Sequence, residues 1–145
     1  MRSSAMSTNL AEAVEHTARE AARRAPITVS ITVTGRPRQV RRRLHDAVVG
    51  TVREAVTNVV KHAEARTVLV VLAFRSRGCR VSISDDGKGF STDQTAVDHF
   101  GLVGMRERVT GCGGSLELES VIGRGTVVRL DVPYGAARRT GRMSS

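Results

Sequence analysis

The chain has 145 residues, of which 40% are hydrophobic, enough for a single domain around one packed core. No apolar run approaches the roughly 20 residues needed to cross a bilayer, and residues 1–5 lack the apolar segment of a signal peptide. We therefore expect a cytoplasmic protein without direct membrane insertion. Cys79 and Cys112 have no metal-type spacing and are interpreted as reduced thiols.

The formal net charge of +9 raises the possibility of a nucleic-acid partner. Much of this charge lies in two clusters, Arg36, Arg38, Arg41, Arg42 and Arg43, and Arg138, Arg139 and Arg142. Four aromatic residues are too few for the stacking platforms that bind single strands, and no helix-turn-helix or zinc pattern is present. We therefore expect no direct nucleic-acid partner. The first interpretation of the clusters is a solvated surface, and the alternative is contact with nucleotide phosphates or an acidic partner.

The first half of the chain predicts a tail, two helices and a strand. Residues 1–8 are polar and predict a flexible tail. An apolar stripe of helical spacing predicts a helix over 10–24, which Pro26 ends, and alternation over 27–33 predicts a half-buried strand. A long helix is expected from 39 to 62.

The second half is dominated by strands. Residues 67–74 and 79–84 are rich in β-branched side chains and predict an antiparallel hairpin, whereas 91–100 has the polar composition of a mobile loop. A short helix over 101–110 precedes two last strands, around 116–118 and 127–132, with a turn at 123–125. This order predicts an α/β fold, a two-layer sandwich with helices on one face of a mixed, mostly antiparallel sheet.

The long helix has an apolar face and a separate polar one. Val48, Val52, Ala55, Val56 and Val59 share the apolar stripe expected to face the sheet. Glu54, Asn58 and Lys61 fall on another face, with His62 at its edge. A carboxylate and an amide oxygen one turn apart suit Mg²⁺, and a lysine suits a polyphosphate, although a solvated helix face would have the same pattern.

An acidic turn, Asp85-Asp86-Gly87-Lys88-Gly89-Phe90, follows the strand expected at 79–84. Its glycines permit positive φ angles and a close approach of the main chain. A carboxylate at the end of a strand can accept hydrogen bonds from a ligand amine. Alone, such a string is as consistent with an ordinary turn as with a ligand site.

Two further glycine-containing segments follow. Residues 101–109 form a loop leading into a helix, whose free backbone N–H groups could bind a phosphate. Residues 123–126, Gly-Arg-Gly-Thr, read as a hairpin turn. Each signal is weak by itself, but the four in this order indicate a nucleotide site.

The same four segments resemble motifs of the sensor histidine kinases. Residues 53–63 resemble the N box, 85–90 the G1 box, 101–109 the G2 region and 123–126 the closing Gly-x-Gly-Thr. The resemblance covers 9–134 and implies the GHKL ATPase fold, with 135–145 a basic flexible tail. The Gly-Leu-x-Gly-Met-Arg-Glu-Arg segment and the Lys-His-Ala ending resemble the subfamily paired with NarL/LuxR-type response regulators.

The resemblance implies ATP and Mg²⁺ as ligands and a role for each matching residue. Asn58 would bind Mg²⁺, and Glu54 would act as general base or hold a water of the metal. Asp85 would accept the adenine amino group, supported by Thr126. The other residues implied are Lys61 and His62 near the phosphates, Gly87 and Gly89 shaping the pocket, Gly101, Leu102, Gly104 and Met105 bordering the ATP lid, and Arg106 as a weaker phosphate candidate.

The resemblance also implies an activity that this chain cannot complete alone. The γ-phosphate of ATP would pass to a histidine on a dimerisation domain, in the same longer protein or a separate chain, and then serve a NarL/LuxR-type response regulator. Leu44-His45-Asp46 imitates an acceptor motif, but His45 lies inside the long helix only nine residues before Glu54, and we interpret it as incidental. His16, on the first predicted helix, is no better a candidate.

Two alternatives stay open at this point. The first is a serine kinase of the anti-sigma-factor type, which shares the N and G1 boxes; the form of residues 101–108 and the Gly-x-Gly-Thr close favour the sensor kinases. The second is a regulatory module that binds ATP without transferring phosphate, against which the presence of both Glu54 and Asn58 argues.

Overall fold

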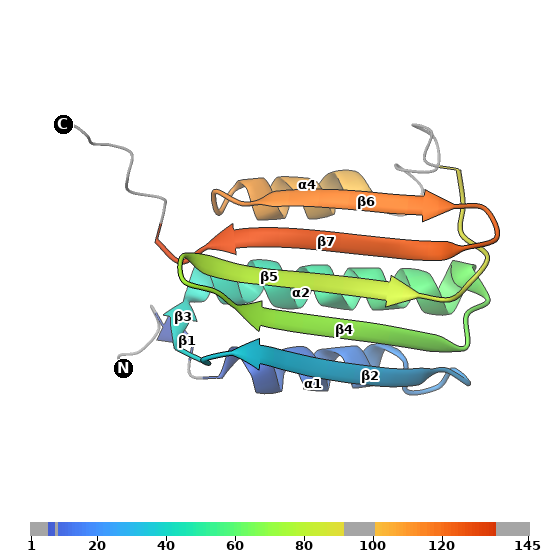
Figure 1. The fold of residues 1–145 in the computed structure, drawn as a ribbon, viewed down its shortest axis with the longest axis horizontal. Helices are drawn as coiled ribbons and strands as arrows, with labels where there is room; N and C mark the ends of the chain where they lie inside the picture. The colour runs from blue at the N-terminus through green and yellow to red at the C-terminus, as the bar shows by residue number, and fades with distance from the viewer. Residues whose placement is uncertain (1–5, 8, 92–100, 136–145) are drawn as a thin grey trace.

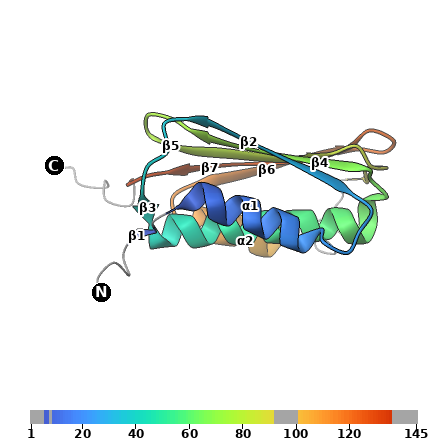
Figure 2. The same ribbon diagram turned by 90° about the horizontal axis from the view of Figure 1, so that it is seen from below.

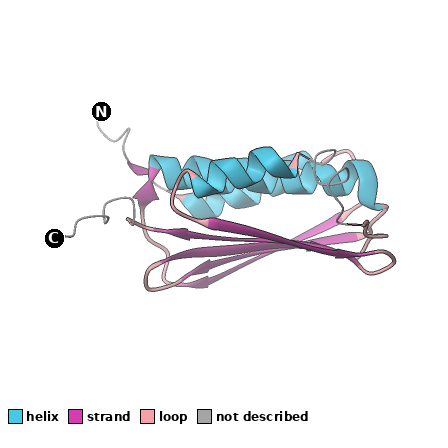
Figure 3. Ribbon diagram, turned by 90° about the horizontal axis from the view of Figure 1, so that it is seen from above, coloured by secondary structure: helices cyan, strands magenta, loops and turns pink. Residues whose placement is uncertain are grey.

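The computed structural model describes residues 6–7, 9–91 and 101–135. It has two layers, with a five-stranded sheet on one side and the helices together on the other (Figures 1–3). The elements are β1 (Met6–Ser7), α1 (Leu10–Ala21), β2 (Thr28–Gly35), β3 (Val40–Arg41), α2 (Arg42–Asn58), the π-helix η2 (Val59–Ala63), β4 (Thr67–Phe74), β5 (Gly78–Asp85), α4 (Leu102–Thr110), β6 (Ser115–Val121) and β7 (Gly125–Pro133). The predicted α/β sandwich is confirmed.

The sheet is mixed, with the strand order β2-β4-β5-β7-β6 (Figure 1). Only β2 and β4 pair in parallel, and their connection contains α2, because parallel neighbours need a long crossover. The remaining pairs are antiparallel, and the predicted hairpin over 67–74 and 79–84 is confirmed by the pairing of Phe74 with Cys79. This arrangement places the end of β5 beside the turn between β6 and β7.

The ends of the first two helices differ from the sequence prediction. Helix α1 ends at Ala21, before the expected limit at 24, and α2 begins at Arg42 instead of 39. The later start has a tertiary cause, since Val40 and Arg41 pair with Ser7 and Met6 in a small second sheet. Pairing across some 30 residues leaves no local signature. Of the predicted loop over 91–100, all but Ser91 lies outside the described residues.

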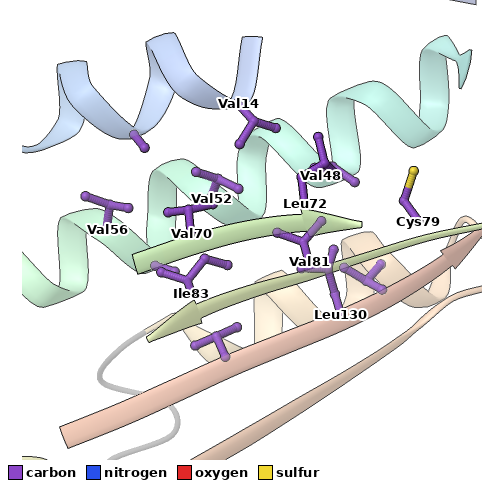
Figure 4. Packing of buried hydrophobic residues seen from close by; sticks show 14 of the residues in the cluster. Val14, Val48, Val52, Val56, Val70, Leu72, Cys79, Val81, Ile83 and Leu130 are labelled. Atoms are coloured by element: carbon purple, nitrogen blue, oxygen red, sulfur yellow. The ribbon is translucent and has the colours of Figure 1, made fainter. Parts of the chain in front are cut away.

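The core fills the space between α2 and the inner face of the sheet (Figure 4). The predicted stripe of α2 is buried throughout, with Val48, Val52 and Val56 fully so. Alternate residues of the strands face it, because successive side chains of a strand point to opposite faces. Burial at this interface therefore fixes which face of α2 is left to line a site.

The arginines at 36–43 lie at the opposite end of the sheet from the acidic turn. Gly35, just before them, pairs with Phe74 at the end of β4, whereas Asp85 pairs with Val68 near its start. These two positions on β4 are about 20 Å apart at the rise of a strand. The structure therefore does not bring this cluster to the Asp85 site, which removes the alternative that it contacts a nucleotide there.

Among the described residues, no helix is long and apolar enough to span a membrane.

Two leucines of β4 test which face of the sheet carries the core. Leu72 is fully buried, whereas Leu69 is 41% exposed on the outer face. We expect Leu72→Ala to lower the free energy of unfolding by about 2–5 kcal/mol, because it removes buried apolar atoms and leaves a cavity. Leu69→Ala, the control on the same strand, should cost less than about 1 kcal/mol. Urea unfolding measures both, and equal losses would contradict the assignment of faces.

Candidate functional site

A pocket opens where the end of α2, the end of β5, the start of α4 and the β6–β7 hairpin meet. Its cavity measures about 70 Å³ and opens to solvent. Its lining residues are Ala55, Asn58, Val59, His62, Ala63, Ile83, Asp85, Lys88, Gly89, Phe90, Leu102, Leu118, Thr126 and Val128. Most of these are apolar, and a few polar groups stand among them, so the pocket suits a mainly apolar group that carries some polar atoms.

Six of the thirteen residues predicted from the sequence line this pocket. They come from all four motif segments and are Asn58, His62, Asp85, Gly89, Leu102 and Thr126. Segments that are far apart in the sequence thus converge on one cavity. The other seven do not line it and are Glu54, Lys61, Gly87, Gly101, Gly104, Met105 and Arg106.

These seven occupy different surroundings, and Arg106 is exposed on α4 (Leu102–Thr110). Glu54 lies beside Gly101, the residue just before α4, because a Cβ added to Gly101 would be 3.0 Å from the Glu54 Oε2 atom. Met105 is buried in the core at 1% exposure, and Lys61 is exposed. Gly104 is open, with nothing within 4 Å of a built Cβ, so no close approach requires a glycine there. Gly87 is buried in the acidic turn, next to the end of η2.

The last turn of the long helix is wider than an α-helix. Residues Val59–Ala63 form the π-helix η2, which follows α2 directly and ends at Glu64 with a left-handed φ of 54°. The sequence predicted an uninterrupted helix to 62, since a π-turn has no periodic signature in five residues. Such turns frequently occur at functional sites. Here Val59, His62 and Ala63 all line the pocket.

The two carboxylates of the acidic turn have separate tasks. Asp86 accepts the backbone N–H groups of Arg66, at 2.8 Å, and Thr67, at 3.0 Å, and these bonds lower its pKa. Asp85 faces the pocket and accepts the Gly87 N–H at 2.7 Å. Burial raises the pKa of Asp85, and hydrogen bonds from the backbone of Gly87 and Thr126 oppose that rise. Asp86 therefore anchors the turn, whereas Asp85 is the partly buried acceptor available to a ligand.

Sequence reasoning missed several lining residues, of which Lys88 is the most connected. Its N–H donates to the Ala63 carbonyl at 2.7 Å, and its carbonyl accepts the Gly123 N–H at 2.5 Å. Its Nζ atom lies 3.3 Å from the Glu64 carboxylate. Lys88 thus joins the acidic turn to η2 and to the β6–β7 turn. The sequence did offer a signal that could have identified Lys88 as a site residue. The chain has only two lysines, Lys61 and Lys88, and both lie in predicted motif segments.

Leu118, Val128 and Phe90 supply apolar walls of the pocket and were also missed. Leu118 and Val128 are paired across β6 and β7 on the face turned toward the helices. The alternation of each strand predicted that they face inward. It could not predict that the helix layer leaves the cavity open above them.

A comparison with known protein families agrees with the resemblance that the four motif segments carry. Residues 44–136, more than half of the chain, match the family described as histidine kinase-, DNA gyrase B-, and HSP90-like ATPase. The chain belongs to this ATPase family. The matched span contains all four motif segments, and the resemblance inferred from them is confirmed.

Relatives of this ATPase domain include sensor histidine kinases. The chain is 38% identical over 90 residues to the sensor histidine kinase LiaS of Bacillus subtilis, covering 62% of this chain and 25% of LiaS. It is 34% identical over 128 residues to the sensor histidine kinase NarS of Mycobacterium tuberculosis, covering 86% of this chain and 29% of NarS. The chain therefore spans about a quarter to a third of the length of these relatives.

Among solved structures, the ATP-binding domain of PrrB from Mycobacterium tuberculosis superimposes on the ATPase domain with a TM-score of 0.72. The superposition covers 88% of this chain and 96% of that structure, at 24% identity. It establishes that the two share a fold.

Two glycines of the β6–β7 hairpin test how tightly the ATPase pocket is built. Both have φ near 88°, but a Cβ on Gly125 would collide with the Asp85 carbonyl, whereas nothing lies within 4 Å of one on Gly123. We expect Gly123→Ala to cost about 1–2 kcal/mol of unfolding free energy, for the left-handed backbone alone. Gly125→Ala should cost more than about 3 kcal/mol, because the Asp85 backbone must also move. Urea unfolding measures both, and equal costs would show that this contact is loose.

Proposed function

We propose that the chain is the ATP-binding catalytic domain, over residues 9–134, of a two-component sensor histidine kinase. It would transfer the γ-phosphate of ATP to a histidine on a separate phosphoacceptor domain. The observation that carries the proposal is one pocket that joins Asn58 of the long helix to Asp85 of the acidic turn, in a chain of this ATPase family. The relatives named as sensor histidine kinases favour this branch of the family.

Adenine recognition is assigned to Asp85. The carboxylate stands in a pocket whose walls include Ile83, Leu118 and Val128, which suit the faces of a purine. A carboxylate accepts a hydrogen bond from the 6-amino group of adenine but not from the carbonyl that guanine has at the same position. An unpaired buried polar group costs about 1–3 kcal/mol, which is about one to two decades in affinity. Thr126, on the same wall, would support the base.

The phosphates are assigned to the helix side of the pocket. Asn58 and His62 line it, and Glu54 and Lys61 lie within one turn of Asn58 on the same helix. The amide oxygen of Asn58 and, through water, the carboxylate of Glu54 are hard ligands that fit Mg²⁺, which when bound neutralises phosphate charge. Lys61 and His62 would add positive charge, and Glu54 could instead serve as general base. Phosphoryl transfer needs chiefly this positioning and charge neutralisation.

Leu102 is assigned to the edge of the ATP lid, since it lines the pocket from the first turn of α4. Gly101, Gly104 and Met105 would belong to the same border, with Arg106 as a further phosphate contact. Their support is the G2-like segment and the placement of Gly101 against Glu54. Gly87 and Gly89 would shape the turn that carries Asp85.

The phosphoacceptor must then come from outside this site. His45 lies near the start of α2, about 20 Å along the helix from Asn58. Its side chain is partly buried, which lowers its pKa. The proposed partners are a phosphoacceptor histidine domain, in the same longer protein or a separate chain, and a response regulator. The form of residues 101–108 supports a regulator of the NarL/LuxR type.

Titration of the purified chain with ATP and GTP, by calorimetry, tests the proposal. The wild-type chain should prefer ATP, and Asp85→Ala should weaken ATP binding about 10- to 100-fold with little change for GTP, because only adenine uses the carboxylate. Asp86→Ala is the matched control, since Asp86 anchors backbone groups of residues 66 and 67. It should lower stability and keep the preference for ATP. An unchanged ATP dissociation constant in Asp85→Ala would remove the adenine assignment, and no binding by wild type would remove the function.

The metal assignment is tested on Asn58. In the wild-type chain Mg²⁺ should strengthen ATP binding, and in Asn58→Ala that gain should be lost while metal-free binding stays within about threefold, since the base contacts remain. The measurement is the ATP dissociation constant with Mg²⁺ and with chelator. An equal gain from Mg²⁺ in both proteins would assign the metal to other residues.

A further inference from the structure

Exposed arginines from separate segments gather at the end of the sheet opposite the pocket. They are Arg36 and Arg38 after β2, Arg75 and Arg77 in the turn between β4 and β5, and Arg80 in β5. The three segments meet here because Gly35 pairs with Phe74, and Phe74 with Cys79 (Figure 1). We call these five arginines the basic end.

Tyr134, just after β7, holds the segments of the basic end together. Its hydroxyl donates to the Arg75 carbonyl at 2.7 Å, and its N–H donates to the Arg77 carbonyl at 3.0 Å. The guanidinium of Arg38 lies over its ring, 3.9 Å from the ring centre. Because the bonds to the turn use backbone carbonyls, they leave the side chains of Arg75 and Arg77 to other partners.

Little of the charge of the basic end is neutralised within the described part of the chain. Arg80 lies 2.8 Å from the carboxylate of Asp131. Across residues 6–7, 9–91 and 101–135, no carboxylate lies within 4 Å of the other four guanidinium groups. Positive charges held near one another without counter-charges attract anions to that part of the surface.

Two hollows that open to solvent lie side by side at the basic end. The first measures about 380 Å³ and is lined by Arg75 and the two arginines after β2. The second measures about 610 Å³ and is lined by Arg75 and the other two arginines. Ser76 also lines both. Among the described residues, Asp131 is the only carboxylate in either lining.

The shape and the cations of this surface favour one kind of anion. A flat bilayer surface does not follow two hollows, and Phe74, the one aromatic residue among the described lining, is only 7% exposed, too little to stack a nucleobase. A guanidinium group pairs with a carboxylate through two parallel hydrogen bonds. An extended chain places a side chain on the same side every ~7 Å, so acidic residues at alternate positions can meet successive arginines.

We propose that the basic end is a docking surface for an extended acidic segment of a partner protein, which lies along the two hollows with its carboxylates on the arginines. Asp85 and the pocket are about 20 Å away along β4. The inference therefore goes beyond the proposed function and does not rest on it.

The probe is a labelled peptide of about ten residues, roughly 33 Å when extended, in which glutamate and serine alternate. A second peptide carries glutamine in place of glutamate. Binding to the full 145-residue chain is measured by fluorescence anisotropy at an ionic strength of about 0.1 M. The glutamate peptide should bind and the glutamine peptide should not. Equal binding of the two peptides, or no binding of either, would overturn the proposal.

The double variant Arg75→Gln, Arg77→Gln should weaken binding of the glutamate peptide about tenfold, because two ion pairs are lost. The matched control is Arg24→Gln, Arg66→Gln, which removes the same charge from exposed positions before β2 and before β4, at the other end of the sheet. It should change the dissociation constant less than about threefold, since charges about 20 Å away are screened. Equal weakening in both variants would show that binding follows net charge alone and would overturn the proposal.

Tyr134 shows where the peptide binds, because the chain has one tyrosine and no tryptophan. At fixed ionic strength, unlabelled glutamate peptide should reduce the quenching of Tyr134 fluorescence by iodide, since its carboxylates displace iodide from the surrounding arginines. Unchanged quenching at saturating peptide would place the peptide elsewhere and overturn the proposal.

Two other anions test the choice of partner, oligothymidylate and vesicles of phosphatidylcholine with phosphatidylserine. Tighter binding of either, with the same loss in Arg75→Gln, Arg77→Gln, would replace the acidic segment by a nucleic acid or a membrane. Thermal unfolding verifies that each variant is folded. ATP binding by the same variant should match wild type, and failure of the wild-type chain to bind ATP would remove the proposed function but leave this docking surface standing.

Discussion

The burial of one face of α2 against the sheet is the constraint on which the rest of the structure depends. Val48, Val52 and Val56 are fully buried there, opposite the inward side chains of the central strands (Figure 4). A helix held by one stripe has no freedom to rotate about its axis without exposing that stripe. The polar residues at its far end are therefore directed to a defined place, and Asn58 and His62 line the same pocket as Asp85.

The pocket itself is built from turns that hold one another. The acidic turn is bonded through Lys88 to Ala63 at the end of η2 and to Gly123 in the β6–β7 turn. Asp86 ties it to the start of β4, and Ser120 ties its end to the same hairpin. The two contacts of Lys88 join backbone groups, and the other two join the short side chains of Asp86 and Ser120 to backbone N–H groups, so no long side chain is needed to shape the pocket. Preorganisation of this kind reduces the ordering cost of binding a ligand.

The pocket combines a mainly apolar wall with a few polar groups. Apolar residues from α2, η2, the strands and α4 form most of the wall, and the few polar groups come from the end of α2, from η2, from the acidic turn and from the start of β7. Asp85 is half-buried, so a hydrogen bond between its carboxylate and a ligand would be partly shielded from water. In such surroundings a polar group left without a hydrogen-bond partner costs binding free energy. In the proposed function, selectivity would depend on the hydrogen-bonding edge of the ligand, and affinity on its apolar faces.

The sequence alone determined the fold class, the buried stripe of α2 and the four motif segments, because each depends on periodicity or on residue types within a few neighbours. It also named six of the residues that line the pocket. Tertiary structure alone decided that β3 precedes α2, that Val59–Ala63 form a π-turn, and that Lys88 and Ser120 hold the site together. The pairing of β3 and the contacts of Lys88 and Ser120 join segments distant in the chain, some 30 residues apart for Phe90 and Ser120, and five residues are too few for a π-turn to leave a periodic pattern. Local patterns carry no record of such contacts, since they exist only once the sheet has brought the segments to one end.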